Sequence, residues 1–392
     1  MLSFNIKSIF INYKKFINLD VDTHSKIFNY SNLLETLKKY KKICSIIPVG
    51  FSVEKRKIFK IKWGIGRKKI FIWSQMHGDE TTGTKSIFDI LNFFLINNNH
   101  EIVKFFFKNI TISFIPMLNP DGSEYFKRRN SINIDLNRDF IRLESPEIKI
   151  LFNEINKENP HILFNLHDQK SIYNVGNKSF NPAILSFLSP STNKKENYNT
   201  VKMKSMGMIY EISKEIKKIL PNNASIGRYS DKHYPNATGD CLQKMGYSCI
   251  LIEAGNYSGD DKKYIIRKYN TISIIFGFYL LSSNYKLEKN YKNYFFIKKN
   301  KNILLDKIYR NIQIKKNNSI YHVDIGLMNF DKFNVKTGIV ESEMKIVDIG
   351  DLSTFFAYKD IIASEKKLFV KKEVNNHGYP EIGDKEKNYN FL

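Results

Sequence analysis

Over most of the first 285 residues, short apolar runs alternate with segments whose apolar residues recur at helical spacing. The apolar runs have the length of buried strands, and turn-forming or polar residues follow them. The runs are 68–74, 110–115, 162–166 and 248–252, and the helical segments between them are 81–95, 147–156 and 201–219. This alternation predicts an α/β fold in which helices cover both faces of a sheet.

Three further elements belong to the same prediction. Residues 52–63 alternate apolar and basic side chains, as a half-exposed strand does, and the Gly64-Ile-Gly66 turn would pair this strand with 68–74. Residues 31–42 fit a helix. Residues 271–282 form the most apolar run, but they fall far short of the ~20 residues that span a bilayer, so they predict a core helix.

The character of the chain changes after residue 285. Residues 1–285 would form the main domain, and 286–302, dense in Lys, Asn and Tyr, would form a linker. In 303–392, short β runs such as 319–323 and 345–348 are punctuated by Gly and Asp. We expect a small β-rich C-terminal domain there, and no constellation in its sequence indicates its role.

The chain carries 62 Lys and Arg against 39 Asp and Glu, a formal net charge of +23. A charge of this size raises the question of a nucleic-acid or membrane partner. The lysines are spread along the chain without a basic block, so we expect no nucleic-acid partner. The three cysteines show no paired spacing, and we see neither a signal peptide nor a membrane-spanning run, which predicts a cytoplasmic protein with reduced thiols.

A histidine and a glutamate, His77 and Glu80, lie where strand 68–74 leads into helix 81–95. In open α/β sheets, sites form at such strand-to-helix corners. Imidazole and carboxylate at this spacing can both reach one cation, and a hydrolytic zinc site commonly has three protein ligands and an open fourth position. Taken alone, the pair is explained more simply by a solvated corner in which Glu80 favours the helix N-terminus.

Two further side chains lie at the ends of later strands. His167 directly follows strand 162–166, on the site-bearing edge of the sheet, and is the candidate third ligand. Glu253 interrupts an otherwise apolar strand, where an unpaired carboxylate is costly to bury. Glu253 is therefore either a general base beside the metal or the partner of a neighbouring Lys or Arg.

Three of the nine arginines, Arg128, Arg129 and Arg138, fall in the loop 119–140, although lysine is the usual cation elsewhere. The planar fork of arginine suits a carboxylate or a developing oxyanion better than an ammonium group does. The loop is therefore expected to recognise an anion, and a solvated Arg-rich surface is the simpler alternative.

In this order along the chain, these residues resemble the zinc carboxypeptidase family, the metallopeptidases of carboxypeptidase A and B type. The resemblance covers roughly residues 50–283. Its marks are the His-x-x-Glu of His77 and Glu80, Asn119-Pro-Asp-Gly122, the Arg-Arg-Asn at 128–130, Asp135-Leu-Asn-Arg138, His167 after an apolar strand, and Glu253. It implies an α/β/α fold with a mixed sheet of eight strands, one zinc ion, and a peptide or peptide-like substrate with a free carboxylate.

Carried over residue by residue, the resemblance implies metal-binding or catalytic roles for four side chains. It implies that His77, Glu80 and His167 bind the zinc ion. It also implies that Glu253 is the general base for the attacking water.

The resemblance gives substrate-binding roles to the arginine-rich loop. Arg129 would polarise the scissile carbonyl, with Arg128 as the less favoured alternative. Asn137 and Arg138 would hold the terminal carboxylate of the substrate, which is what makes such an enzyme an exopeptidase.

The family also has a mobile tyrosine that caps the substrate. In the loop 228–240, Tyr234 is the best match, with His233 and Tyr229 as rivals, and this loop departs from the usual pattern. The same loop should line the specificity pocket, so the preferred side chain is left open.

The leading hypothesis is a zinc-dependent metallocarboxypeptidase that removes a C-terminal residue. The nearest alternative is a zinc amidase acting on muropeptides, or a deacylase of N-acyl amino acids, with the same fold and the same zinc, base and arginines. A more remote alternative is a basic binding protein without catalysis.

Overall fold

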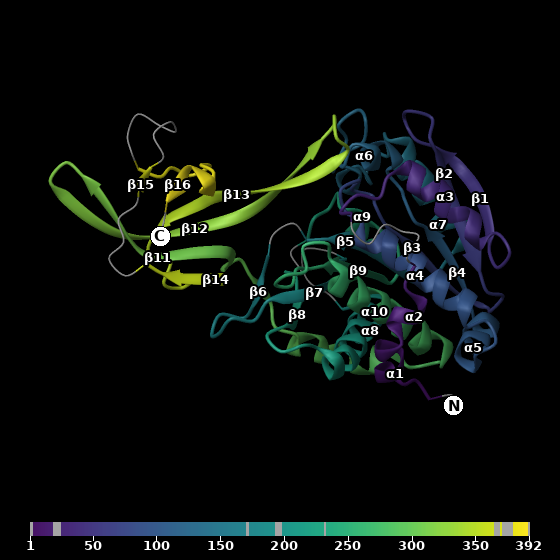
Figure 1. Cartoon of the computed structure of the whole chain (residues 1–392). Helices are drawn as coiled ribbons and strands as arrows, with labels where there is room; N and C mark the ends of the chain where they lie inside the picture. Colours follow the sequence, from purple (N-terminus) through teal and green to yellow (C-terminus); the bar gives the residue numbers. More distant parts are fainter. Residues whose placement is uncertain are drawn as a thin grey trace. The chain divides into compact units, whose positions relative to one another are not determined.

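Figure 1 shows the computed structural model of the chain, which describes residues 3–18, 25–169, 172–192, 198–230, 233–363, 369–370 and 379–390. The chain divides into two compact units. One comprises Met1–Lys170 with Ala183–Lys299, and the other comprises Ser171–Pro182 with Asn300–Leu392. The second unit thus takes in a short segment from the middle of the chain. The domain boundaries expected at residues 285 and 302 stay predictions.

The first unit is built on one sheet of eight strands in the order β1-β2-β4-β3-β5-β9-β7-β8. The strands are β1 (Ser45–Phe51), β2 (Lys57–Trp63), β3 (Lys68–Trp73), β4 (Ile110–Ile115), β5 (Ile162–Asp168), β7 (Ala183–Leu188), β8 (Ser225–Arg228) and β9 (Cys249–Ala254). β4, β3, β5 and β9 are parallel, as are β7 and β8, and antiparallel pairs join β1 to β2, β2 to β4 and β9 to β7. This mixed eight-stranded sheet confirms the predicted fold class.

Helices surround this sheet, and residues that commonly begin or end a helix lie at their ends. α7, for example, has a proline in its first turn, and the residue that follows its end, Asn159, has a φ of 47°, the left-handed conformation that asparagine tolerates. Among the described residues, no helix combines the length and apolar character needed to cross a membrane. The helices are α1 (Ile6–Ile11), α2 (Tyr13–Phe16), α3 (Tyr30–Tyr40), α4 (Thr82–Ile96), α5 (Glu101–Asn109), α6 (Pro120–Glu124), α7 (Pro146–Glu158), α8 (Thr200–Ile216), α9 (Thr238–Lys244) and α10 (Tyr264–Ser282), with 3-10 helices η1 (Leu136–Arg138), η2 (Lys217–Ile219) and η3 (Leu287–Phe296).

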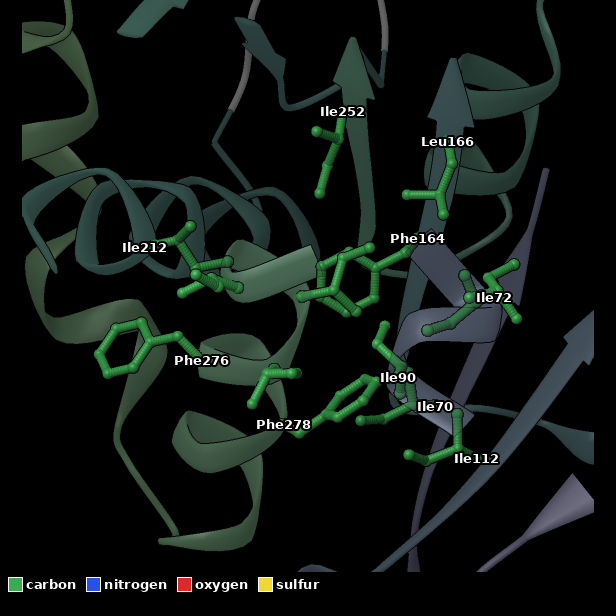
Figure 2. Close-up of a cluster of buried hydrophobic side chains, with 14 of the residues drawn as sticks. Ile70, Ile72, Ile90, Ile112, Phe164, Leu166, Ile212, Ile252, Phe276 and Phe278 are labelled. Atoms are coloured by element: carbon green, nitrogen blue, oxygen red, sulfur yellow. The ribbon is translucent and has the colours of Figure 1, made fainter. Parts of the chain in front are cut away.

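Two apolar cores lie on the two faces of the sheet, because successive side chains of each strand point to opposite faces. On one face, residues of β3, β4, β5 and β9 pack against α4, α8 and α10, and Figure 2 shows Phe164 and Leu166 of β5 among them. On the other face, Leu163 of β5 joins Leu151 and Ile155 of α7. By the same alternation, Asn165 and His167 point to the face that carries α7.

The pairing expected between residues 52–63 and 68–74 is wrong, because β4 lies between β2 and β3. Gly64 and Gly66 do not make a tight hairpin turn. They pass against the start of β4, where a Cβ on Gly66 would lie 1.9 Å from the Asn109 carbonyl carbon and one on Gly64 would lie 2.2 Å from the Ile110 oxygen. The two glycines therefore serve a close backbone crossing.

A buried ion pair ties the N-terminal helices to the core. The Arg267 guanidinium of α10 binds both carboxylate oxygens of Asp89 in α4, with an Nε–Oδ2 distance of 2.7 Å. The Asn18 amide donates to Asp89 Oδ1 (2.7 Å), and the Tyr13 hydroxyl donates to Asp89 Oδ2. Asp89 and Tyr13 are fully buried, so this network fixes α2 against α4 and α10.

Part of the expected linker is packed into the first unit. Residues 287–296 form η3, and Tyr294 within it is fully buried. The Tyr294 hydroxyl accepts a hydrogen bond from the Ser189 amide (3.2 Å), and the Arg228 guanidinium lies 5.1 Å from its ring centre. These contacts attach the segment to β7 and β8.

The second unit is β-rich, as expected for residues 303–392. Four strands form a sheet in the order β13-β12-β11-β14, with β11 (Leu304–Lys316), β12 (Ser319–Asn334), β13 (Ile339–Gly350) and β14 (Phe356–Ile362). Shorter pairs join β6 (Asn174–Val175) to β10 (Asn300–Lys301), and β15 (Phe369–Val370) to β16 (Tyr389–Asn390); a 3-10 helix, η4, covers Glu386–Asn388. Ile312, Ile325, Leu327 and Ile346 form the centre of its core.

Candidate metal centre

Three neighbouring strands bring the candidate site together. β3 leads into the loop that carries His77 and Glu80, β5 lies beside β3, and β9 lies beside β5. The ligand atoms of His77, Glu80 and His167 all lie within 4.8 Å of one another. Their side chains are buried, with exposed fractions of 2%, 4% and 2%. The three residues predicted as ligands therefore converge.

One carboxylate faces both imidazole rings. His77 Nδ1 lies 2.7 Å from Glu80 Oε1, and His167 Nδ1 lies 2.7 Å from Glu80 Oε2. The other ring nitrogen of His77, Nε2, lies 3.1 Å from Asp135 Oδ1. Two imidazole nitrogens and a carboxylate form the donor set of a zinc site with three protein ligands, and a carboxylate behind a ligating histidine is usual in such sites. The donors present therefore fit zinc.

Backbone crossings and a buried glutamine shape the ligand loop. Gly78 passes so close to α6 that a Cβ would lie 2.1 Å from the Gly122 carbonyl carbon, which excludes any larger residue. Gln75 is fully buried with a φ of 43°, and its Nε2 donates to the Gly78 carbonyl (3.1 Å) and to Ser123 Oγ (3.0 Å). This packing fixes the corner between β3 and α4.

The cluster strongly perturbs its own titration. Burial alone would raise the pKa of Glu80, but the two histidines outweigh it and hold that pKa well below its ordinary value. Burial alone would lower the pKa of His77, but Glu80 and Asp135 outweigh it and raise that pKa to about 9. For His167, burial prevails and the pKa is lowered. The metal-free cluster thus holds one carboxylate and one imidazolium in a buried ion pair.

Glu253 lies next to the ligands on β9. It is the register partner of His167 on β5, so the two side chains leave the same face of the sheet. On its other side, Glu253 is in register with Ser186 of β7. Burial and the charge of Glu80 raise the pKa of Glu253 well above its ordinary value, while His77 and Lys263 act in the opposite sense.

The two adjacent arginines of the loop point to different places. Arg128 Nε donates to Asp135 Oδ2 (3.0 Å), and its Nη1 lies 3.4 Å from Glu80 Oε1 and 3.2 Å from His77 Nδ1. Arg129, the residue favoured from the sequence for the scissile carbonyl, is exposed and donates to the Asn133 carbonyl (3.0 Å). Of the two arginines, Arg128 is the one whose guanidinium reaches the candidate ligands.

The two residues expected to bind the terminal carboxylate of the substrate lie in η1, and the tyrosine expected to cap the substrate lies in the loop before α9. Asn137 Oδ1 accepts a hydrogen bond from the Thr238 amide at the start of α9 (3.1 Å). Arg138 is exposed, and its guanidinium lies 5.7 Å from the ring centre of Tyr234, which is 48% exposed. These contacts join the two loops and place a solvent-accessible arginine beside an aromatic ring.

The rivals of Tyr234 have other partners. His233 Nδ1 lies 3.2 Å from Asp240 Oδ1, in the first turn of α9. The Tyr229 hydroxyl donates to Gln169 Oε1 (3.2 Å). Neither contact involves His77, Glu80 or His167.

Sequence reasoning gave no role to two acidic residues that support the ligands. Asp135 links His77 to Arg128, as described above. Asp168 follows His167, and its amide donates to Glu80 Oε2 (3.2 Å) while its carboxylate accepts from the Thr82 hydroxyl (2.7 Å). Asp135 begins the Asp135-Leu-Asn-Arg138 motif and Asp168 directly follows His167, so their positions in the sequence could have indicated this supporting role.

Comparisons with known proteins find similarity to carboxypeptidases. Residues 30–162 match the profile of a family described as zinc carboxypeptidase. Carboxypeptidase SOL1 of Arabidopsis thaliana is 32% identical over 87 residues, which are 19% of this chain and 18% of that protein. Probable carboxypeptidase 2 of Trichophyton verrucosum is 32% identical over 106 residues, or 26% and 20%. The matches thus span about a fifth of each curated relative's length.

Solved structures share the fold. A metallo-carboxypeptidase from Burkholderia cenocepacia superposes with a TM-score of 0.52 at 14% identity, over 66% of this chain and 70% of that one. Bovine thrombin-activatable fibrinolysis inhibitor, in complex with tick carboxypeptidase inhibitor, gives a TM-score of 0.54 at 15% identity, over 68% and 100%. The resemblance to the zinc carboxypeptidase family is confirmed, and at these identities the structures show the fold alone.

Proposed function

We propose that this chain is a zinc-dependent carboxypeptidase that hydrolyses the C-terminal peptide bond of a peptide. The observation that carries the proposal is the convergence of His77, Glu80 and His167, with Glu253 in register beside His167. A ligand set of two histidines and one glutamate leaves a fourth position open, and a carboxylate stands next to it.

His77, Glu80 and His167 would hold the zinc ion. Bound there, zinc supplies a Lewis acid that polarises a carbonyl and lowers the pKa of water. Asp135 fixes the orientation of the His77 ring through Nε2, so that Nδ1 faces the ligand position. Glu80 supplies the negative charge that offsets the cation in a buried site.

Glu253 would act as the general base. Its carboxylate takes a proton from the attacking water and passes it to the nitrogen of the leaving amino acid. Burial and the neighbouring charge of Glu80 raise the pKa of Glu253, which makes its carboxylate a stronger base than that of an exposed glutamate.

Three side chains of the arginine-rich loop would bind the substrate. Arg128 reaches Glu80 and His77, so its guanidinium can stabilise the oxyanion that develops on the scissile carbonyl. Arg138 is exposed and has no ion pair among the described residues, which suits a clamp for the terminal carboxylate, with Asn137 beside it. Tyr234, next to Arg138, is our candidate for the capping side chain.

The test combines metal analysis with product release. The purified protein should contain about one zinc per chain and release free amino acids from peptides with a free C-terminal carboxylate, but not from the same peptides amidated there. Stoichiometric zinc without release would contradict the proposal. Cleavage of an N-acyl amino acid or a muropeptide instead would support the amidase or deacylase alternative, which shares the same zinc, base and arginines.

A further inference from the structure

The loop before α9 carries Tyr234, and apolar packing does not hold this loop in place. Tyr234 is 48% exposed, and Pro235 is exposed as well. Within the described part of the chain, neither core of the first unit includes a residue from 233–236. A segment with few buried apolar contacts opens easily, so the loop needs another anchor.

A hollow lies directly against this loop. Its volume is about 480 Å³, and it is lined by both neighbours of Tyr234 in the sequence, His233 and Pro235. Phe140 and Ile141, which follow η1, line it too. Protein interiors are normally packed without voids of this size. The loop therefore does not pack tightly against the segment after η1, and the hollow leaves it room to move.

Bonds from α9 hold the loop instead. Asp240, in the first turn of α9, is 5% exposed, and its Oδ1 accepts a hydrogen bond from the Tyr234 amide (3.2 Å). The same oxygen lies 3.2 Å from His233 Nδ1. Cys241 Sγ also donates to the Pro235 carbonyl (3.0 Å), but a thiol is a weak donor. One buried carboxylate is thus the main anchor of the loop.

The same helix is bonded to the residues proposed to bind the terminal carboxylate of the substrate. The Thr238 amide at the start of α9 donates to Asn137 Oδ1 (3.1 Å). Arg138 follows Asn137, and its guanidinium lies 5.7 Å from the ring centre of Tyr234. The first turn of α9 therefore binds the carboxylate clamp through Thr238 and the candidate cap through Asp240.

We propose that Asp240 is a positioning residue for substrate binding, because it holds Tyr234 beside Arg138. The inference rests on the proposed carboxypeptidase function. Without the Asp240 carboxylate, the loop is free to shift into the adjoining hollow, and Tyr234 no longer stays at the clamp. Such a change weakens the binding of the substrate and of its transition state alike, so KM rises while kcat stays nearly the same.

The test is a double-mutant cycle between Asp240 and Tyr234. The zinc-loaded full chain hydrolyses an N-blocked dipeptide with a free C-terminal carboxylate, and kcat and KM are measured for Asp240→Ala, Tyr234→Ala and the double variant. We expect Asp240→Ala to raise KM about 10-fold and to change kcat by less than about 3-fold. Because Asp240 acts through Tyr234, the double variant should have the same KM as Tyr234→Ala.

Two further variants separate positioning from general stability. Asp240→Asn keeps an oxygen that can accept from the Tyr234 amide, so its KM should lie between those of the natural chain and Asp240→Ala. Asp324 of the second unit is the matched control, because its carboxylate accepts from the Asn311 amide (3.0 Å) and from the Arg310 guanidinium (3.0 Å). Asp324→Ala should leave KM unchanged.

The outcomes separate this inference from the proposed function. A natural KM in Asp240→Ala or in Tyr234→Ala, or a double variant in which the two single effects multiply, overturns the role of Asp240 and leaves the carboxypeptidase standing. An equal rise of KM in Asp324→Ala does the same. If Asp240→Ala does not fold, Asp240→Asn takes its place in the cycle. Absence of hydrolysis by the natural zinc-loaded chain overturns the proposed function and this inference together.

Discussion

His167 and Glu253 are register partners on the parallel strands β5 and β9, so the candidate third ligand and the candidate base leave the sheet side by side. The two residues come from distant parts of the sequence, yet a rigid inner ladder sets their spacing. A site built on strands rather than on loops holds its reacting groups within narrow limits.

Glu253→Gln should abolish turnover while the protein still binds zinc. The amide keeps the volume of the side chain but cannot accept the proton, so kcat should fall by about 10²–10⁴-fold. Metal analysis and peptide hydrolysis on the same sample measure both quantities. Glu144→Gln, an exposed glutamate, is the control and should behave like the natural chain. Unaltered turnover in Glu253→Gln would rule out its role as the base.

Arg128→Ala and Arg129→Ala form a matched pair that tests which arginine stabilises the oxyanion. Loss of an oxyanion donor costs about 10²–10³-fold in kcat, so Arg128→Ala should fall by this amount with KM little changed. Arg129 is exposed and bonded to a loop carbonyl, so its replacement should change kcat by less than about 3-fold. The opposite ranking would restore Arg129 as the residue at the carbonyl.

Zinc binding should displace a proton from His77. Because Glu80 and Asp135 raise its pKa to about 9 in the metal-free cluster, the ring is protonated at neutral pH, and zinc needs the unprotonated nitrogen. The apparent affinity for zinc should therefore rise about tenfold per pH unit up to about pH 9 and level off above it. Competition with a chelator across this range measures the slope.

Asp135→Asn provides the check on that explanation. It removes one of the two groups that raise the pKa of His77, so the affinity should level off at a lower pH. The lost support of the His77 ring should also weaken zinc binding by about 10–100-fold at high pH. A zinc affinity that does not vary with pH in the natural chain would contradict the protonated state of His77.

The Asp89–Arg267 pair should contribute strongly to the stability of the fold and should play no part in catalysis. Asp89→Asn leaves the Arg267 guanidinium buried without its counter-charge, and we expect a loss of about 3–5 kcal/mol in the free energy of unfolding. Urea denaturation measures this loss. Glu35→Gln breaks the exposed pair with Lys38 and should cost less than about 1 kcal/mol. Equal losses in the two variants would show that the buried network is not a main support of the fold.

The sequence pointed to the candidate ligands because His77 and Glu80 lie in the loop that follows a buried strand and His167 lies near the end of another. An apolar run such as 110–115, bounded by Pro116, has the same limits in the structure, and the positions of His77 and His167 relative to such runs are local information. Burial requires these strands to be apolar, so Glu253 was conspicuous. Local periodicity therefore sufficed for the site-bearing edge of the sheet.

The order of the strands and the direction of single side chains were not predictable in the same way. The pattern of residues 52–63 contains no information on whether β3 or β4 will lie beside it, because backbone hydrogen bonds are alike in both cases. Arg128 and Arg129 are adjacent and chemically identical. Which one faces the ligands depends on Asp135, seven residues away, to which the Arg128 side chain is bonded.

β9 is inserted between β5 and β7, although it is made after both of them. During synthesis, the emerging chain therefore has two inner strands with unpaired edges until residues 249–254 have left the ribosome. Open strand edges invite pairing with other chains, so this interval is when the nascent protein is most exposed to aggregation. Because the strand that closes the gap also carries Glu253, a chain that stops short of it lacks both a complete sheet and the base.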